Sequence, residues 1–329
     1  MLTKKLIAGV LCALTMAVAG CGGGSGDKKD SKQAEGEWKP KGAISIIVPA
    51  GAGGDTDLSA RVFAKFAKQK TGCDFVVVNA NGAAGSVASN QVKNAKPDGM
   101  TVLYGHALVN VANIAGVTDY NYTAFKIGPS FAMEPAQQLY VNKDKYKDLN
   151  AFIAAAKANP GKLKACTEVG AYTYYELLEF ENKAGIKLDL VDVGSNADKI
   201  TALLSGQADL MPGAYVNTKD YVASNKFTML GAPTDKRYDL IKEFPTFKEQ
   251  GIDFVYPNQE FSFYFPKDTP DNVVAWFDKV TKGILDDPEA KKALAGLSIM
   301  PNYKNPEDTT KAEKYCYDTI KAIADRLKK

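Results

Sequence analysis

Glycine-rich turns follow two apolar runs in the first half of the sequence. VPAGAGGDTD contains Gly51, Gly53 and Gly54, and NANGAAGSV contains Gly82 and Gly85. Glycine allows backbone N–H groups to point inward at angles that a side chain blocks. Each turn also leads into a predicted helix, whose N-terminal end is electropositive. The two turns therefore predict backbone donors for a carboxylate or a phosphate.

Two turns in the second half of the sequence have the same character. TEVGAYTYY, residues 167–175, and VGSNADK, residues 193–199, each lead from a predicted strand into a predicted helix. A single turn of this kind can serve only to join two elements. Because the pattern recurs in both halves, we expect several donors to converge on one small anion.

The elements that position these turns alternate between strand and helix. The first half of the pattern has predicted strands at 44–48, 75–79 and 101–104 and predicted helices at 57–70 and 86–94. The pattern then restarts, with strands at 138–141, 164–167, 188–193 and 208–211 and helices at 149–158, 172–184 and 197–205. This alternation predicts an α/β fold with a mainly parallel sheet, which binds ligands at the carboxyl ends of its strands.

The restart of the pattern predicts two lobes. Helices predicted at 271–285 and 309–326 come last in the chain, and we expect both to pack on the first lobe. We therefore assign residues 43–138 plus 262–329 to lobe 1 and residues 139–261 to lobe 2. A chain that crosses between two α/β lobes more than once describes a hinged clamp around a ligand cleft.

The first residues have the features of a lipoprotein export signal. Lys4 and Lys5 precede an uncharged apolar segment, 6–19, that is short for a bilayer span, and small residues then lead to Cys21. A short membrane anchor and an ordinary signal peptide are the alternatives. We predict lipidation of Cys21.

This signal has consequences for the residues around it. We assign residues 1–20 to the signal peptide and residues 21–42, which are rich in Gly, Ser and Lys, to a flexible tether. The predicted location is the extracytoplasmic face of the cell membrane, in the periplasm or on the cell surface.

Composition excludes several classes of function. Cleavage after residue 20 leaves 39 basic and 38 acidic residues. The chain therefore lacks the excess of positive charge that is typical of nucleic-acid-binding proteins. Cys73, Cys166 and Cys316 are widely spaced, without a C-x-x-C pair, so we expect no metal and at most one internal disulfide. We expect no cofactor, and a monomer.

The sequence also argues against an enzyme. The first turn departs from the dinucleotide fingerprint because Thr56 occupies the third glycine position, and the strand at 75–79 ends without an acid for a ribose hydroxyl. His106 is the single histidine, and G-x-S-x-G is absent, which leaves no basis for a hydrolytic triad.

The same turns resemble the extracytoplasmic solute receptors of tripartite tricarboxylate transporters, also called Bug proteins. VPAGAGGDTDLSAR resembles the family's first signature, approximately V-P-F-x-A-G-G-x-x-D-x-x-A-R. VNANGAAG, followed by PDGMT, resembles its second signature, and the likeness runs from residue 43 to about residue 300.

The resemblance implies a type II periplasmic-binding-protein fold: two Rossmann-like lobes with a hinge and a central ligand cleft. It implies a solute-binding receptor that captures a small carboxylate-bearing metabolite and delivers it to the integral-membrane subunits of the transporter, with no bond made or broken. The alternatives are an exported α/β enzyme and a ligand sensor outside transport, each acting on a small organic acid.

The resemblance also implies which residues contact the ligand. Carried over position by position, the contacts are Ala52, Gly53, Asp55, Thr56, Asp57, Gly170, Ala171, Tyr172, Thr173, Gly194, Ser195 and Ala197. The second glycine turn adds Asn81, Gly82 and Gly85, and the side chains of His106 and Glu168 are further candidates. For His106 a structural role is favoured over a binding role, and Asp57 could equally bind an ammonium group or stabilise the start of its helix.

The turns of the second lobe depart from the family pattern by adding acids. Glu168 and Asp192 are both extra carboxylates near the predicted cleft. They would repel a di- or tricarboxylate unless they face solvent. If the two acids face solvent, the ligand can be a mono- or dicarboxylate. If they face the cleft, an aromatic acid or a molecule that also carries a positive group, as an amino acid does, fits better.

Overall fold

The computed structural model describes residues 37–326. The predicted signal peptide, its lipidation site Cys21 and the first part of the predicted tether lie outside the described residues. We call the six-stranded sheet and the helices on it the first lobe, and the two smaller sheets with their helices the second lobe.

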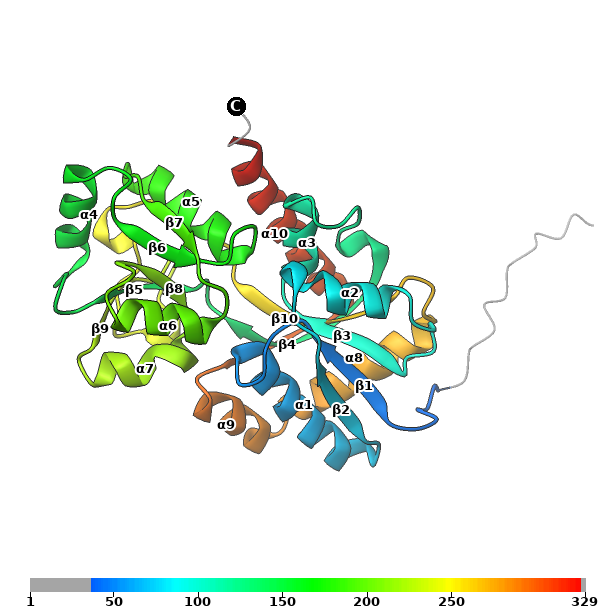
Figure 1. Ribbon diagram of the computed structural model, residues 1–329. Coiled ribbons are helices and arrows are strands. Elements are labelled where there is room, and N and C mark those ends of the chain that lie inside the picture. Colours follow the sequence, from blue (N-terminus) through cyan, green and yellow to red (C-terminus); the bar gives the residue numbers. More distant parts are fainter. Residues whose placement is uncertain (1–36, 327–329) are drawn as a thin grey trace, which may run out of the picture. The chain divides into compact units, whose positions relative to one another are not determined.

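The sheet of the first lobe has the strand order β11-β4-β10-β3-β1-β2 (Figure 1). Its strands are β1 (Ile44–Val48), β2 (Phe75–Asn79), β3 (Thr101–Gly105), β4 (Phe125–Glu134), β10 (Gln259–Pro266) and β11 (Met300–Lys304). β1 pairs in parallel with β2 and β3. β10 runs antiparallel to β3 and β4, and β11 antiparallel to β4, so the prediction of a mainly parallel sheet is wrong for this half. The chain between β4 and β10 builds the second lobe instead of a helical crossover, so parallel pairing is not required.

β4 contains residues that usually mark a loop. Its register with β10 shifts between Ser262 and Tyr264, where the strand passes Gly128 and Pro129. This irregularity accommodates a proline within a paired strand. A Cβ at Gly128 would lie 2.5 Å from Cε2 of Phe265, so close packing requires glycine there.

Helices cover both faces of the sheet, as the α/β prediction requires. One face carries α1 (Asp55–Thr71), α8 (Asp271–Leu285) and α9 (Pro288–Gly296), and the other carries α2 (Ser86–Lys93) and α3 (Leu108–Ile114). Consecutive residues of β1 pack on opposite faces, Ile46 with the first group and Ile47 with the second. Phe63 of α1 and Phe277 of α8 both pack against Phe263 of β10.

The second lobe contains two small sheets, β8-β5-β9 and β6-β7 (Figure 1). Its strands are β5 (Gln138–Asn142), β6 (Lys164–Thr167), β7 (Asp189–Asp192), β8 (Met211–Gly213) and β9 (Phe227–Gly231). Its helices are α4 (Leu149–Ala158), α5 (Tyr172–Ala184), α6 (Asn196–Leu204) and α7 (Tyr215–Ala223). β6 and β7 are parallel, whereas β5 is antiparallel to both of its neighbours. Phe180 packs against Phe247 and Phe254 in the core.

α10 (Pro306–Arg326) contacts both lobes. Glu313 accepts hydrogen bonds from Tyr264 of β10 and Asn110 of α3 in the first lobe. Near the end of the helix, Arg326 forms an ion pair with Glu179 of α5 in the second lobe. The expectation that this helix packs on the first lobe therefore describes only part of its contacts.

The first described residues pack against α8. Trp38 lies 5.1 Å from Trp276, centroid to centroid, and Glu37 forms an ion pair with Lys279 at 2.8 Å. The last part of the segment that the sequence assigns to the tether thus contacts the first lobe. Short 3₁₀ segments lie in connections: η1 (Ala83–Gly85), η2 (Tyr122–Ala124), η3 (Asp239–Ile241) and η4 (Lys248–Gln250). Within residues 37–326, no helix has the length and apolarity that crossing a membrane needs.

Candidate functional site

The first glycine turn is held together by Asp57. Its carboxylate accepts hydrogen bonds from the Gly53 N–H at 2.9 Å and from Asn79 Nδ2 at 2.9 Å, and it pairs with Arg61 at 2.9 Å. Asn79 also donates to the Ala50 carbonyl, which ties the turn to the end of β2. Burial alone would raise the pKa of Asp57, but the bonds from Arg61, Gly53 and Asn79 outweigh it and lower the pKa. Asp57 therefore shapes the turn, and the Gly53 N–H is already occupied.

Asp55, two residues earlier, has an incompletely satisfied carboxylate. Its side chain is buried, and Oδ1 accepts the Thr56 N–H at 2.8 Å. Oδ2 has no hydrogen-bond partner among the described residues. Burial raises the pKa of Asp55, opposed by the Thr56 bonds and by the positive charge of Lys199 on α6. Asp55 thus faces a lysine of the other lobe. Ala52 of the same turn is exposed.

The second glycine turn packs against Pro49 of the first turn and against Leu108 of α3. Gly85 is buried with φ +84°, and its N–H donates to the Gly82 carbonyl at 3.0 Å. A Cβ at Gly85 would lie 3.0 Å from Cβ of Leu108 and 3.4 Å from Cβ of Pro49. Asn81 and Gly82 are exposed. The turn therefore supports the first one, and the need for glycine at position 85 is structural.

The turn between β6 and α5 is anchored by its own contacts. The Ala171 N–H donates to the Glu168 carbonyl at 3.0 Å, and the Thr173 hydroxyl bonds that of Thr167 at 2.8 Å. Tyr172 is buried, and its hydroxyl donates to the Pro257 carbonyl. Gly170 adopts φ +79°.

The turn between β7 and α6 forms a capping box. The Ser195 N–H donates to Asp198 Oδ2 at 3.0 Å, and the Ser195 hydroxyl accepts the Asp198 N–H at 3.4 Å. The Gly194 N–H donates to Oδ1 of Asp192, which is exposed to solvent. Ala197 is also exposed. In this conformation the donors of Gly194 and Ser195 are satisfied by the chain itself.

Residues of the two lobes approach one another near the strand ends, at places that include the following three. The His106 ring, after β3, lies 5.9 Å from the Tyr172 ring at the start of α5. The Tyr215 N–H, at the start of α7, donates to Oε1 of Glu134 at the end of β4, at 3.0 Å. A Cβ at Gly170 would be 3.3 Å from Ala115, just after α3. The turn between β6 and α5 thus lies against the first lobe, next to the ends of β3 and α3.

Besides Asp55, three more buried charged residues of the described chain lie at this junction. Lys199 of α6, Glu134 of β4 and Glu176 of α5 are each at most 5% exposed. Oε2 of Glu134 and both carboxylate oxygens of Glu176 have no hydrogen-bond partner within residues 37–326. Burial lowers the pKa of Lys199, opposed by Cys166, Glu168, Glu176 and Asp55 in that order.

Burial shifts the pKa values of the acids at the junction upward. Burial, reinforced by the negative charge of Asp55, raises the pKa of Glu134 well above its usual value. Burial likewise raises the pKa of Glu176, with Lys199 opposing it. The pKa of Glu168 is also raised by burial and lowered in part by Lys199. The positive charge of Lys199 therefore interacts with several acids at once.

Sequence reasoning missed Lys199 and Glu176. Lys199 shares the buried face of α6 with Leu203, four residues later, and Glu176 shares that of α5 with Phe180. A charge at the helical spacing of an apolar stripe is the signal that could have found both.

His106 is buried beside aromatic rings. Its ring contacts those of Tyr172 and Phe261, and its Nδ1 has no hydrogen-bond partner in the described part of the chain. Burial lowers the pKa of His106 to about 4, so the imidazole is neutral at physiological pH. A neutral imidazole can donate or accept one hydrogen bond at the junction but carries no charge to an anion.

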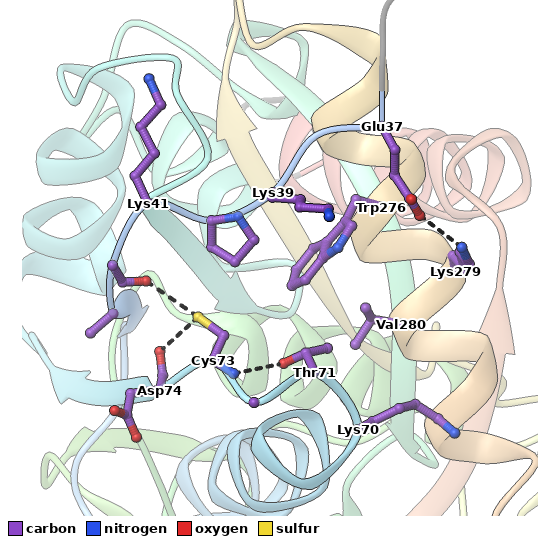
Figure 2. Close-up of a pocket in the computed structure, with 14 residues that line it drawn as sticks. Glu37, Lys39, Lys41, Lys70, Thr71, Cys73, Asp74, Trp276, Lys279 and Val280 are labelled. Atoms are coloured by element: carbon purple, nitrogen blue, oxygen red, sulfur yellow. Dashed lines mark hydrogen bonds and ion pairs between the residues drawn. The ribbon is translucent and has the colours of Figure 1, made fainter.

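A surface cavity of about 760 Å³ lies elsewhere (Figure 2). Its walls include Ala43 before β1, Cys73 before β2, and Trp276 and Lys279 of α8. This is the amino end of the parallel strands, opposite the predicted turns. Cys73, Cys166 and Cys316 are free thiols. Among residues 37–326, no group of three or more His, Cys, Asp or Glu side chains could hold a metal.

Comparison with known proteins places these features in a family. The model of the tripartite tricarboxylate transporter family receptor matches residues 59–327. The chain belongs to this family. The UPF0065 protein in the gbd 5′ region of Cupriavidus necator is 29% identical over 307 residues, which cover 90% of each protein.

Solved structures show the same fold. One described as a periplasmic transporter is 26% identical, with a TM-score of 0.80, covering 88% of this chain and 98% of that one. MatC from Rhodopseudomonas palustris, solved with bound malate, is 22% identical, with a TM-score of 0.78, covering 87% of this chain and 100% of that one. The two-lobed periplasmic-binding-protein fold is thus confirmed. As a member of this receptor family, the protein is an extracytoplasmic solute-binding receptor and not an enzyme.

Proposed function

We propose that this receptor is anchored by a lipid at Cys21, captures a small carboxylate-bearing metabolite and delivers it to the membrane subunits of a tripartite tricarboxylate-type transporter. In this proposal lobe 1 comprises residues 43–138 plus 262–329, and lobe 2 comprises residues 139–261. The lobes close on the ligand at the carboxyl ends of β1 and β6. MatC, a structural neighbour, was solved with the dicarboxylate malate bound, which supports a carboxylate as the ligand.

One observation carries this proposal: residues of both lobes converge on a buried lysine. Lys199 is 5% exposed and interacts electrostatically with Asp55 of the first lobe and Glu168 of the second. A buried ammonium group and the N-terminal ends of α5 and α6 all favour a negatively charged guest. Movement of the two lobes opens and closes access to this position.

The residues proposed to contact the ligand are those of the facing turns. Asp55, His106, Glu134, Tyr172 and Lys199 approach the junction with their side chains. Gly53, Gly194 and Ser195 have N–H groups that are bonded within the chain in this conformation. They contribute to binding by shaping the turns, or after the turns rearrange around the ligand.

A thermal-shift screen of the mature protein tests the proposal. The panel contains mono-, di- and tricarboxylates, aromatic acids and amino acids. A ligand at one hundred times its Kd stabilises a protein by about 2.7 kcal/mol, which raises the melting temperature measurably. The control variant K145M removes a second-lobe lysine that pairs with Asp209, away from the junction, and should respond as the wild type does.

The variant K199M identifies the site. We expect it to fold and to lose most of the shift given by the active compounds, because the buried positive charge is gone. A panel without any active carboxylate would contradict the proposed function. An undiminished shift in K199M would contradict the placement of the site.

A further inference from the structure

The junction between the lobes has more buried acids than bases. Asp55, Glu134 and Glu176 are each at most 6% exposed, and Glu168 is partly buried beside them, whereas Lys199 is the buried base that interacts with this group. Burying a carboxylate without a partner is costly, so such groups are usually paired or hydrogen-bonded. Here one positive charge faces several potential negative charges.

The oxygens left without partners come from both lobes. Oδ2 of Asp55 and Oε2 of Glu134 belong to the first lobe, and Oε1 and Oε2 of Glu176 belong to the second; none has a hydrogen-bond partner among the residues described. The other oxygens of Asp55 and Glu134 are already fixed, by the Thr56 N–H and by the Tyr215 N–H. Each of these two carboxylates is therefore held in place with one oxygen available.

Asp55 and Glu134 are close enough for the charge of one to act on the other. Two neighbouring buried carboxylates repel each other unless a proton or a cation lies between them. The residues described include no group of His, Cys, Asp and Glu arranged to hold a metal ion. A cationic group with several N–H donors, such as a primary ammonium, fits two carboxylates that each offer one oxygen.

We propose that the ligand carries an ammonium group as well as a carboxylate, so that it is an amino acid or a related zwitterion, and that Asp55 and Glu134 bind the ammonium group. This inference rests on the proposed function for the carboxylate half of the ligand. Lys199 and the N-terminal ends of α5 and α6 favour that half.

The test compares amino acids with acids of the same skeleton that lack the amine. Isothermal titration calorimetry of the mature protein near pH 7.5 measures Kd for L-aspartate and succinate, L-glutamate and glutarate, L-leucine and 4-methylpentanoate, and L-phenylalanine and 3-phenylpropionate. We expect one amino acid to bind roughly 100-fold more tightly than its deaminated partner, as for a buried charge pair that loses one member.

The variants D55N and E134Q connect this preference to the two carboxylates. Each keeps its size and removes its charge, and we expect each to weaken binding of the amino acid at least tenfold while leaving the deaminated acid within about threefold. The matched control is E313Q, since Glu313 is a buried carboxylate with a hydrogen bond to each oxygen. It should leave the preference unchanged. Melting curves without ligand show that each variant folds.

The outcomes separate the two proposals. If a deaminated acid binds as tightly as its amino acid, or if D55N and E134Q together leave the preference intact, the ammonium site is wrong while the carboxylate receptor stands. If no carboxylate of either kind binds, here or in the wider screen, both proposals fail. If E313Q abolishes the preference as D55N does, the effect is a general one of buried charge and the assignment is overturned.

Discussion

Two acids of one turn, Asp55 and Asp57, have opposite electrostatic environments. Asp57 is surrounded by the donors of Gly53, Asn79 and Arg61, and its pKa is lowered despite its burial. Asp55 accepts bonds from the N–H and the hydroxyl of Thr56, but burial outweighs them and raises its pKa. One carboxylate is therefore part of the scaffold, whereas the other keeps an oxygen for a guest.

The role of Asp57 gives a prediction for stability. We expect D57A to lower the free energy of unfolding by about 3 kcal/mol, because it leaves the Gly53 N–H and Asn79 without their acceptor and Arg61 without its ion pair. R61A should cost less than about 1 kcal/mol, since the Arg61 side chain is 51% exposed and Asp57 keeps its other partners. Urea denaturation near pH 7 measures both values. Equal losses would show that the ion pair, rather than the turn, matters.

His106 allows a direct measurement of burial at the junction. The chain has one histidine, so a single set of imidazole C–H resonances is expected in the NMR spectrum. Burial lowers its pKa from 6.5 to about 4. Because the folded-state pKa lies below the unfolded one, the stability due to neutral His106 is present above pH 6.5 and is lost as pH falls toward 4. A titration midpoint near 6.5 in the native protein would contradict this placement.

At the scale of elements, the local sequence predicted correctly the helices and strands whose hydrophobic pattern and flanking residues indicate the same structure. The helix predicted at 149–158 coincides with α4, and the strand predicted at 164–167 coincides with β6. β4 was missed because Gly128 and Pro129 are typical of loops. They are tolerated only because of the irregular pairing with β10 and the close approach of Phe265, which depend on chain far away in sequence.

For the candidate site too, the sequence predicted the local features and missed those that depend on distant residues. Glycine turns that end strands are local features, so the sequence located the turns correctly. Whether a particular N–H is available depends on side chains from neighbouring elements, such as Asp57 for Gly53. The partners of Asp55 and Glu134 come from different lobes, so the balance of buried charge at the junction could not be read from local spacing.

The two glycine turns should differ in their tolerance of a methyl group. Gly53 has φ +83° with no atom within 4 Å of a Cβ in the described structure, so G53A should cost only the strain of the left-handed backbone, about 1 kcal/mol. Gly85 has φ +84° and would also bring its Cβ to 3.0 Å from Leu108. We expect G85A to cost roughly 3 kcal/mol in total. Chemical denaturation measures the free energy of unfolding of both variants. A larger decrease for G53A than for G85A would contradict the prediction.

At the scale of the whole molecule, α10 links the parts of the fold. Its Glu313 is buried against Tyr264 and Asn110, and its end reaches Glu179 in the second lobe. β4 and β10 cross between the lobes beside it. A change in the charge of Glu313 therefore affects the packing of the helix that connects both lobes.

This position predicts a pH dependence of global stability. Burial, opposed by the bond from Tyr264, raises the pKa of Glu313 from 4.5 to about 7; Glu260 adds to this increase, while Asn110 and Lys304 oppose it. Because the folded-state pKa is the higher one, the stabilisation is complete below pH 4.5 and is lost as pH rises to 7. We expect the wild type to lose up to about 3 kcal/mol relative to E313Q across this interval. Denaturation curves measured at several pH values give the stability of each protein, and a difference in stability that does not change with pH would contradict the raised pKa.

We predict that a lipid on Cys21 holds the folded part at the membrane. Cys21 follows small residues after the apolar segment 6–19, whereas Cys73 lies just before β2 inside the folded part. In the proposed lipoprotein the Cys21 thiol forms the lipid thioether, so C21S should abolish incorporation of an alkyne-tagged fatty acid in growing cells. C73S, the matched control, should label as the wild type does. Labelling that persists in C21S, or that disappears in C73S, would assign the anchor to a different residue.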